Sequence, residues 1–543
     1  MSGEYVLILG AGLMQKRAFE ASRKYGYKIL CVDANPNAVC VPLADEFFCI
    51  DLKDKEKIAN LALGYKNSLK AVFTCGTDFS ISVSYVAEKC NLISHTFNAS
   101  QKTCSKVLMR QCFHENKIPS PDFTEITNAL TKEELDSIKN KIIYPKVIKP
   151  SDNMGARGCR LIRNKEEFSF AVEDAINNSR TKTAILEDYM SGKEFSIDAI
   201  VHNGTFTVTG FADRHIYFPP YFIELGHTLP SNIDESSKNK LISTFADAVH
   251  SLGLTCGVAK ADIKLTEKGP MIGEIAARLS GGYMSGWTFP YASNFDLTGQ
   301  ALLIALGKEP GDLLSNRRKL HIENKYFELY EVPCTKFSAE RSYISIPGVI
   351  KKITFFNDDF SIANDFVETE LVKNFFPRVK ENACVDFPRN NVQKCGNFIA
   401  VASSYESASQ YAENASSRII LELESFNAQT NKFLNSIEND YEKGFPYSAY
   451  KSDSKEAGDL IKLFENIKIK LNEKVLSYIP ENIFKSLDLV KDYNYRSILT
   501  SIKMFDILRP NHIEIDGKLF VNFLLRGGVQ GILYLCDSYS QFI

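Results

Sequence analysis

The stretch ADIKLTEKGPMIGEIAAR, residues 261–278, decides the fold class of the middle of this chain. Two β-rich runs, Ala261 to Leu265 and Met271 to Ala276, flank the turn signal Glu267-Lys268-Gly269. Runs of this kind on either side of a glycine-containing turn predict a β-hairpin. We therefore expect antiparallel strands in the middle of the chain.

The same predicted hairpin carries two carboxylates, Asp262 and Glu274. Pairing across the turn brings them to about the same level on one face of the sheet. Two facing carboxylates repel each other unless they share a proton or a cation, and Mg²⁺ on oxygen ligands solves this. Arg278 follows closely, so its guanidinium can bind a phosphate or a carboxylate in the same cleft. A purely structural acid pair is the alternative interpretation.

A short apolar strand ends at Lys149 and opens into the polar loop Ser151–Gly158. The free backbone N–H groups of such a loop can bind phosphate oxygens, and Gly155 and Gly158 allow close approach. Lys149 and Arg157 would offset the phosphate charge. A surface turn is the alternative, so this loop has to be judged together with its neighbours.

The next segment, Ile185–Ser196, joins a strand to an irregular hinge. Adenine needs an apolar slot with one hydrogen-bonding backbone edge, and a strand that leads into a hinge supplies both. Glu187 could accept a hydrogen bond from the adenine amino group, and Glu194 could accept from the ribose hydroxyls. Two solvated glutamates beside a turn are the alternative.

The order of these features resembles that of the ATP-grasp superfamily, from about residue 4 to about residue 405. The segment Ser280-Gly281-Gly282 belongs to this pattern, and Gly396–Val401 fits a trailing β-rich domain of the biotin-carboxylase or purine-synthetase type. The resemblance implies an ATP-dependent ligase that activates a carboxylate as an acyl phosphate and joins it to an amine. This is C–N bond formation of the EC 6.3 type, with ATP and Mg²⁺ (or Mn²⁺) as cofactors.

Carried over to this sequence, the resemblance implies a role for each matching residue. The nucleotide-binding residues would be Lys106, Lys149, Gly155, Arg157, Gly158, Glu187, Tyr189 and Glu194. The metal ligands would be Asp262 and Glu274, the catalytic residues Lys149 and Arg278, and the substrate-binding residues Glu224, His227 and Arg278. Lys106 resembles the first ATP lysine of the superfamily and Lys149 the second.

Two positions depart from the superfamily pattern. Many members have Asn where this chain has Ala276, so one usual metal oxygen is missing and a water could replace it. Ser105 stands where an acidic residue often precedes the first ATP lysine.

Within the superfamily, the segment Pro219–Pro230 is similar to the substrate segment of amino-acid (dipeptide) ligases. Glu224 or His227 would then contact the amino substrate, although His227 is equally well explained as a hydrogen-bonded loop histidine. The same framework serves ligases of the bicarbonate type, carbamoyl-phosphate-like or carboxylase-like, and of the purine pathway. The identity of the carboxylate and of the amine stays open.

The glycine turn Gly10-Ala11-Gly12 is the main alternative site. A dinucleotide fold has the pattern GxGxxG, but its third glycine is replaced by Gln15 here. Asp33 nevertheless lies at the end of the next strand, where it could hold a ribose. An NAD-linked oxidoreductase is therefore an alternative of another class, and a non-catalytic ATP-binding protein is a third.

The predicted fold class is α/β, with an N-terminal doubly wound parallel sheet, a central ATP-grasp α+β domain, a β-rich C-terminal domain and an extra mixed helical and β tail. The predicted domains are a Rossmann-like domain over residues 1–98, an ATP-grasp domain over 99–310 with subdomains 99–185 and 186–310, a β-rich domain over 311–425, and an α+β module over 426–543.

Individual elements are predicted as well. Ser100–Glu115 is expected to be one helix, and Phe195–Val201 with Thr205–Thr209 a hairpin. Apolar residues at helical spacing from Leu460 to Leu471 predict a helix with one buried face. The chain is expected to end in a hairpin through Asp516-Gly517 and an apolar strand to Cys536.

Composition restricts the class of partner. The net charge of −2 and the absence of long charged blocks argue against nucleic acid and anionic membranes. No apolar stretch approaches the roughly 20 residues that span a bilayer, and the N-terminus reads as a strand rather than a signal peptide. Thirteen cysteines without a CxxC pair indicate reduced, mostly buried thiols. We expect a cytoplasmic enzyme acting on small molecules, with homodimerisation as one role for the tail.

Overall fold

A computed structural model describes residues 3–436, 447–451 and 453–542 of the chain. The chain divides into two compact units. Unit 1 comprises Met1–His215, His227–Ala339 and Val401–Tyr405. Unit 2 comprises Ile216–Gly226, Glu340–Ala400 and Glu406–Ile543. The four predicted domain ranges stay a prediction.

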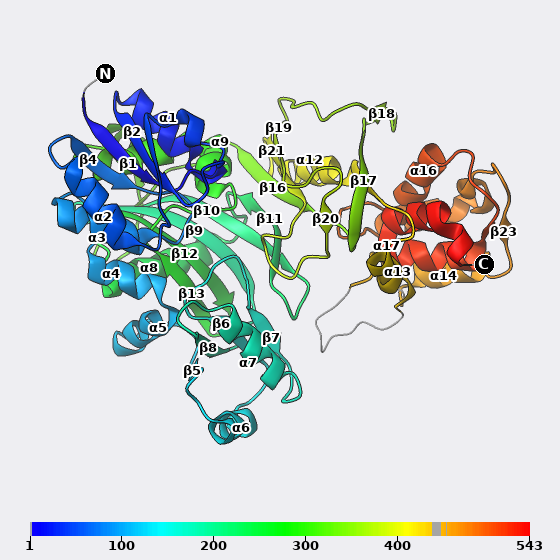
Figure 1. Ribbon diagram of the computed structural model, residues 1–543, viewed down its shortest axis with the longest axis horizontal. Coiled ribbons are helices and arrows are strands. Elements are labelled where there is room, and N and C mark those ends of the chain that lie inside the picture. Colours follow the sequence, from blue (N-terminus) through cyan, green and yellow to red (C-terminus); the bar gives the residue numbers. More distant parts are fainter. Residues whose placement is uncertain (1–2, 437–446, 452, 543) are drawn as a thin grey trace. The chain divides into compact units, whose positions relative to one another are not determined.

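Unit 1 begins with a parallel sheet in the strand order β3-β2-β1-β4 (Figure 1). Val6 and Ile8 of β1 pack into one hydrophobic cluster, whereas Leu7 and Leu9 pack into another. A parallel sheet with an apolar core on both faces is doubly wound, which confirms the predicted class of this part. Its elements are β1 (Tyr5–Leu9), η1 (Leu13–Gln15), α1 (Lys16–Lys24), β2 (Lys28–Asp33), η2 (Val41–Leu43), β3 (Glu46–Cys49), α2 (Lys55–Gly64), β4 (Leu69–Phe73) and α3 (Ser80–Cys90).

The predicted continuous helix Ser100–Glu115 is wrong, because the chain breaks at Ser105. Helix α4 (Phe97–Cys104) ends before this residue and α5 (Lys106–Glu115) begins after it. Ser105 has an extended backbone, and its side chain accepts a hydrogen bond from the N–H of Leu108. A serine that caps a helix N-terminus satisfies a backbone N–H that the helix itself leaves unpaired.

A small antiparallel sheet in the order β5-β8-β6-β7 follows in unit 1. The apolar faces of its strands and of helix α7 share one hydrophobic cluster around Ile148 and Phe168. The predicted polar loop connects β6 to β7. The elements are β5 (Phe123–Thr127), α6 (Lys132–Lys141), β6 (Lys146–Pro150), β7 (Arg160–Ile162), α7 (Phe168–Asn177) and β8 (Thr183–Asp188).

The larger sheet of unit 1 contains both predicted hairpins. The pair β9–β10 turns at Asn203-Gly204 and the pair β12–β13 turns at Glu267-Lys268, so both predictions are confirmed. The strands are β9 (Lys193–His202), β10 (Thr205–Tyr217), β11 (Ile223–Leu229), β12 (Gly257–Thr266), β13 (Gly269–Ala276), β14 (Arg318–Lys319) and β15 (Glu328–Glu331). The helices are α8 (Glu235–Leu252), η3 (Met284–Thr288), α9 (Phe289–Ser293), α10 (Leu297–Ala305) and α11 (Gly311–Asn316).

Unit 2 contains the predicted β-rich part of the chain. Strand β17 pairs with β18, β20 and β22, and β19 pairs with β21. Helix α12 follows strand β21 in the chain. The elements are β16 (Phe337–Tyr343), β17 (Gly348–Phe356), β18 (Ile362–Ala363), β19 (Val372–Pro377), β20 (Cys384–Val385), β21 (Gly396–Ala402), α12 (Tyr405–Ser417) and β22 (Ile419–Leu423).

The tail of unit 2 is more helical than its sequence predicts. The expected terminal hairpin and strand are wrong: Asp516 caps the long helix α17 by accepting a hydrogen bond from Leu519 N–H. The predicted helix near Leu460 is α14, but it ends at Phe464, and Leu471 is 60% exposed. The elements are α13 (Ala428–Asn435), α14 (Lys455–Phe464), β23 (Lys468–Ile469), η4 (Val475–Tyr478), η5 (Glu481–Ile483), α15 (Phe484–Leu489), α16 (Ile498–Leu508), β24 (Ile515–Asp516), α17 (Gly517–Ser538) and η6 (Tyr539–Gln541).

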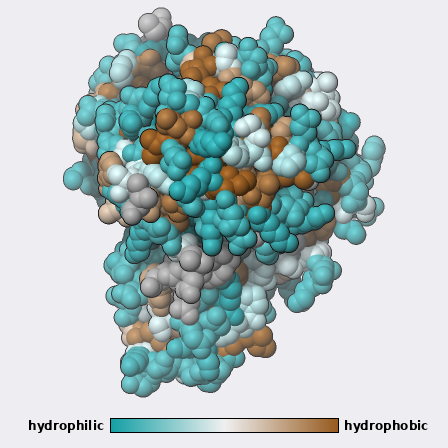
Figure 2. All heavy atoms as spheres, turned by 90° about the vertical axis from the view of Figure 1, so that its right-hand side faces the viewer, coloured by the Kyte–Doolittle hydropathy of each residue, from teal (hydrophilic) through white to brown (hydrophobic). Residues whose placement is uncertain are grey.

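The segment Gly517–Gln541 is long and apolar enough to cross a membrane, judged by length and composition only. The sequence-based expectation that no apolar stretch approaches this length does not hold for this segment. Within unit 2, however, 83% of its most apolar window is buried. The helix is also interrupted at Gly528, whose φ of 60° lies in the left-handed region. In the described part of the chain this segment is the core helix of unit 2, around which α13, α14 and α16 are arranged (Figure 1). The face drawn in Figure 2 is largely hydrophilic, with hydrophobic residues in small groups.

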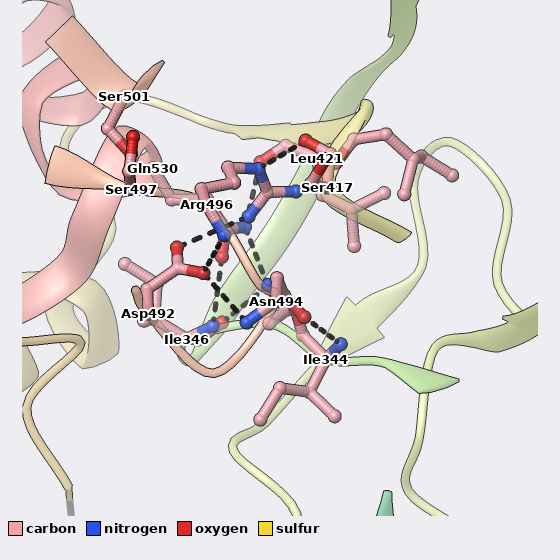
Figure 3. A network of polar contacts seen from close by, with 12 residues as sticks. Ile344, Ile346, Ser417, Leu421, Asp492, Asn494, Arg496, Ser497, Ser501 and Gln530 are labelled. Carbon is pink, nitrogen blue, oxygen red and sulfur yellow. Dashed lines mark hydrogen bonds and ion pairs between the residues drawn. The ribbon is translucent and has the colours of Figure 1, made fainter. Parts of the chain in front are cut away.

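Buried polar side chains join the tail to the β-rich part of unit 2 (Figure 3). The side-chain amide of Asn494 accepts a hydrogen bond from the N–H of Ile344 at 2.8 Å and donates one to its carbonyl at 2.9 Å. Arg496 donates to the carbonyls of Ser417 and Ile419. These hydrogen bonds connect the tail to backbone groups of the β-rich part, and the two parts share one hydrophobic core.

All thirteen cysteines are free thiols, as predicted, and only Cys49 and Cys384 are exposed. Burial raises the pKa of the Cys31 thiol to about 12 and of the Cys40 thiol to about 11. These thiols therefore stay protonated and unreactive at neutral pH.

We expect Asn494→Ala to destabilise unit 2 strongly. The change leaves the N–H and the carbonyl of Ile344 buried without a partner, at a cost of about 1–3 kcal/mol for each group. Urea denaturation of the full chain measures the loss. Asn435→Ala is the control, since the side chain of this exposed asparagine donates to the carbonyl of Asn431 in its own helix. Equal losses in the two variants would contradict the role given to Asn494.

Candidate functional site

The candidate site lies on one face of the larger sheet in unit 1. Alternate residues of a strand share a face, and along β9 and β12 one set is polar or charged while the other is apolar. The apolar set, including Ile197 and Ile263, packs with α8 in a hydrophobic cluster. The polar face consists of Glu194, Ser196 and Asp198 on β9, Arg214 on β10, Lys260, Asp262 and Lys264 on β12, and Glu274 on β13.

Asp262 and Glu274 are directly paired across β12 and β13, as the sequence predicts. Asp262 lies 3.0 Å from the guanidinium of Arg214 and also contacts the ammonium of Lys260. Burial opposes ionisation of Asp262, but Arg214 and Lys260 outweigh it and lower the pKa of the carboxyl to about 2. Glu274 lies 3.3 Å from the ammonium of Lys106. Both carboxylates therefore lie in contact with cationic side chains.

Lys106 connects this sheet to the polar loop after β6. Its ammonium donates to the carbonyl of Asn153 at 2.9 Å, and its backbone N–H donates to the carbonyl of Ser151. The residue is only 9% exposed. The candidate first phosphate lysine is thus placed between the loop and the metal-ligand candidate Glu274.

Lys149 on β6 and Glu187 on β8 are diagonal neighbours across the two strands. The Glu187 carboxylate lies 2.6 Å from the Lys149 ammonium and 2.8 Å from Nε of Arg110, and it is 1% exposed. Burial opposes the charge on Glu187, but Arg110 and Lys149 together hold its pKa below the usual range. Sequence reasoning missed Arg110, although it lies one helical turn after Lys106 and on the same face of α5.

The polar loop has the backbone that its glycines predict. Gly155 and Gly158 have φ values of 70° and 68°, and Ala156 also has a positive φ. A Cβ at Gly158 would lie 2.7 Å from Cβ of Asn178, so only glycine fits there. Arg157 donates from Nε to the carbonyl of Met154 within the loop.

The hinge candidates Tyr189 and Glu194 lie before and at the start of β9. Glu194 pairs with Arg214 at 2.6 Å and with Lys264 at 3.2 Å. The Lys264 ammonium also donates to the carbonyl of Met190 and lies 5.5 Å from the centre of the Tyr189 ring. Tyr189 is 39% exposed, so its ring is accessible to a ligand.

Arg278 is held by the N-terminal sheet. Its guanidinium lies 2.6 Å from Asp78, which follows the end of β4. Burial opposes the charge of Arg278, but Asp78 outweighs it and raises the arginine pKa. The pair fixes the candidate anion-binding arginine at the carboxyl end of a parallel strand, where open α/β sheets bind ligands.

Asp198 is a second residue that sequence reasoning missed. Its carboxylate accepts hydrogen bonds from the N–H and the hydroxyl of Ser280, at 3.2 and 2.7 Å. Burial raises the pKa of Asp198 to about 6, against the opposing effect of these hydrogen bonds and of Lys260. The polar alternation Glu194, Ser196, Asp198 was the signal that could have found it.

The other two substrate candidates, Glu224 and His227, belong to different units. His227 is fully buried in unit 1, on β11 rather than in a loop, and its Nε2 lies 2.7 Å from the hydroxyl of Thr288. Glu224 belongs to unit 2, where its N–H donates to Asn391. Their substrate roles stay predictions.

Side chains of unit 1 form hydrogen bonds in and beside the glycine turn after β1. Asp33, the candidate ribose ligand, accepts hydrogen bonds from the N–H groups of Ala11 at 2.7 Å and Asn35 at 2.8 Å. Gln15 is buried and bonds to both backbone groups of Cys75. Both acceptor oxygens of Asp33 are therefore already engaged within the protein.

The described residues contain no group of three or more His, Cys, Asp or Glu side chains that could hold a metal ion. Asp262 and Glu274 form a pair of hard oxygen donors, which fits one Mg²⁺ that completes its shell with water and phosphate oxygens. The donor set therefore fits a divalent ion shared with a polyphosphate better than an ion held by protein alone.

Residues 142–286, which carry most of this site, match the family model described as an ATP-grasp domain. This chain thus contains an ATP-grasp domain, which confirms the superfamily resemblance.

Solved structures with the same fold include an L-amino acid ligase from Bacillus licheniformis, with a TM-score of 0.64 at 16% identity, covering 78% of this chain and 99% of that chain. A phosphoribosylglycinamide synthetase from Anaerococcus prevotii has a TM-score of 0.58 at 19% identity, covering 78% of this chain and 100% of that one. At these identities the likeness shows the fold. It confirms the predicted ATP-grasp architecture.

Human carnosine synthase 1 is similar in sequence, with 23% identity over 348 residues. The match covers 59% of this chain and 42% of the human protein, so the chain spans well under half of that relative. A formate-dependent phosphoribosylglycinamide formyltransferase from Prochlorococcus marinus is 25% identical over 192 residues, 34% of this chain and 47% of its own length.

We expect Glu187→Gln to destabilise unit 1 far more than Asp188→Asn. The first change leaves Arg110 and Lys149 as buried charges without their counterion, at a cost of about 3–5 kcal/mol. The second removes a partly exposed pair with Lys146, worth about 0–1 kcal/mol. Denaturant unfolding of both variants gives the two free energies, and similar losses would show that Glu187 is not the compensating charge.

Proposed function

We propose that this protein is an ATP-dependent carboxylate–amine ligase that works through an acyl phosphate and releases ADP and phosphate. The observation that carries the proposal is the facing pair Asp262 and Glu274, surrounded by Lys106, Arg214 and Lys260 within the ATP-grasp domain. Such a surface suits a bound polyphosphate and a divalent ion.

The proposed nucleotide site follows from the same contacts. Lys106, Lys149 and the loop N–H groups near Gly158 bind the phosphates, with Arg157 at the edge of the loop. Glu187 and Tyr189 border the base, and Glu194 borders the ribose. In this proposal Asp262 and Glu274 hold Mg²⁺ or Mn²⁺, which supplies Lewis-acid charge neutralisation on the phosphate oxygens.

The proposed chemistry begins with a carboxylate, which is a poor acyl donor because it would have to expel oxide. A carboxylate oxygen attacks the γ-phosphorus of ATP, and the bond to the bridging oxygen breaks to give ADP. The amine nitrogen then attacks the acyl carbon, phosphate leaves, and the amine gives up a proton. Lys149 and Arg278 offset the anionic charge of both steps, and the hydrogen-bonded Asp78 holds Arg278 in place.

The amino-acid ligase type is the finer part of the proposal. It is supported by the segment Pro219–Pro230, with Glu224 and His227, and by the likeness to an L-amino acid ligase and to carnosine synthase 1. A purine-pathway or bicarbonate type is the second candidate, supported by the likeness to phosphoribosylglycinamide enzymes. We propose small-molecule partners and a cytoplasmic location, with the tail as a candidate dimer surface.

The oxidoreductase alternative has less support. Its ribose ligand would be Asp33, but both oxygens of this carboxylate already accept backbone hydrogen bonds. Opening the site for a dinucleotide would leave the N–H groups of Ala11 and Asn35 to find new partners.

We expect phosphate release from ATP that depends on Mg²⁺ and on both an acid and an amine, with ADP as the nucleotide product. A screen of pairwise amino acids, together with bicarbonate and simple carboxylic acids, measures it. Glu274→Ala should reduce turnover by roughly 10²-fold or more, because it removes a proposed ligand of the divalent ion that offsets the charge of the phosphates. Glu267→Ala, an exposed glutamate at the turn of the same hairpin, should leave turnover unchanged. AMP and pyrophosphate as products would contradict the mechanism.

A further inference from the structure

Lys260 occupies an unusual position on the polar face of the sheet. It is paired in register with Asp198 on one side and with Ala276 on the other. Cross-strand partners have their Cβ atoms about 5 Å apart on the same face. The side chain of Lys260 therefore leaves the sheet next to Ala276, where the superfamily pattern has an asparagine and this chain has a methyl group.

The surroundings of Lys260 are those of a bound cation. Its ammonium contacts the Asp262 carboxylate, and the side chain is only 11% exposed. Asp198 is its cross-strand neighbour, and Oδ1 of Asp198 is buried without a hydrogen-bond partner in the described part of the chain. A positive charge between two carboxylates compensates both, as a metal ion would.

A second divalent ion has few ligands left on this surface. Mg²⁺ takes six oxygens and usually keeps one or two carboxylates among them. Asp262 and Glu274 can serve one ion, but Ala276 offers no oxygen for another. An additional ion on the Asp262 side would also have to displace the ammonium of Lys260, which is held there already.

We propose that this ligase works with a single divalent ion and that the ammonium of Lys260 takes the place of a second one. The inference rests on the proposed function, because it assumes that the site binds ATP with a metal. Lys260 thereby becomes a charge-neutralising residue for the phosphate oxygens, with Asp262 shared between the ammonium and the metal ion. The fixed charge of the Lys260 ammonium replaces the charge of a second metal ion, which the protein would have to bind from solution.

Counting bound Mn²⁺ tests this inference without measuring turnover. The full chain is dialysed against Mn²⁺ with saturating β,γ-methylene ATP, and bound ions are counted by electron paramagnetic resonance. We expect one Mn²⁺ per chain in the wild type. The double variant Lys260→Gln with Ala276→Asn should bind two, since it removes the ammonium and restores an oxygen ligand.

Lys264→Gln is the matched control, because it removes a lysine four residues further along the same face of β12, one whose ammonium pairs with Glu194, whereas that of Lys260 pairs with Asp262. It should still bind one ion. Two ions in the wild type would overturn the proposal, and this measurement does not depend on how the variants fold. One ion in a folded double variant would also overturn it. If no nucleotide is retained at all, the proposed function itself fails and the inference falls with it.

Discussion

The compensation of buried carboxylates by cations, in both the larger and the small antiparallel sheet, is the constraint on which the rest of unit 1 depends. Asp262 and Glu187 are both anionic because Arg214 with Lys260, and Arg110 with Lys149, outweigh the cost of burial. Removing one partner of such a pair costs several kcal/mol, so these charges fix where the strands and α5 lie. The same fixed cations form a surface on which a polyphosphate needs little reorganisation.

The N-terminal sheet contributes to this surface although it carries no nucleotide pattern of its own. Asp78, at the end of β4, holds Arg278, and Cys75 forms a bridge with Leu279. Asp33 accepts a hydrogen bond from the N–H of Ala11 in the glycine turn, so this turn is held by a contact within unit 1. The parallel sheet thus serves as a support that positions an arginine of the ATP-grasp domain.

Much of the candidate site could be predicted from local sequence patterns. The register of Asp262 with Glu274 followed from a turn with glycine and two β-rich runs, and the loop after Lys149 from its glycines. Partners distant in sequence could not be predicted: Arg110 with Glu187 and Asp78 with Arg278 depend on how helices and strands pack, which periodicity does not encode.

The predictions of a terminal hairpin and strand failed for the same reason, because packing of distant elements decides the structure of the tail. Asp516-Gly517 is a strong hairpin signal, yet Asp516 is also a good helix cap, and only the core of unit 2 decides between the two. That core needs a long apolar element against α14 and α16, which a two-stranded hairpin could not fill. Asn494 and Gln530 then bond to the backbone near Ile344 and Ile346, so the tail completes the β-rich part. A tail that completes a neighbouring core is a structural part of the enzyme, whatever surface it offers to a partner.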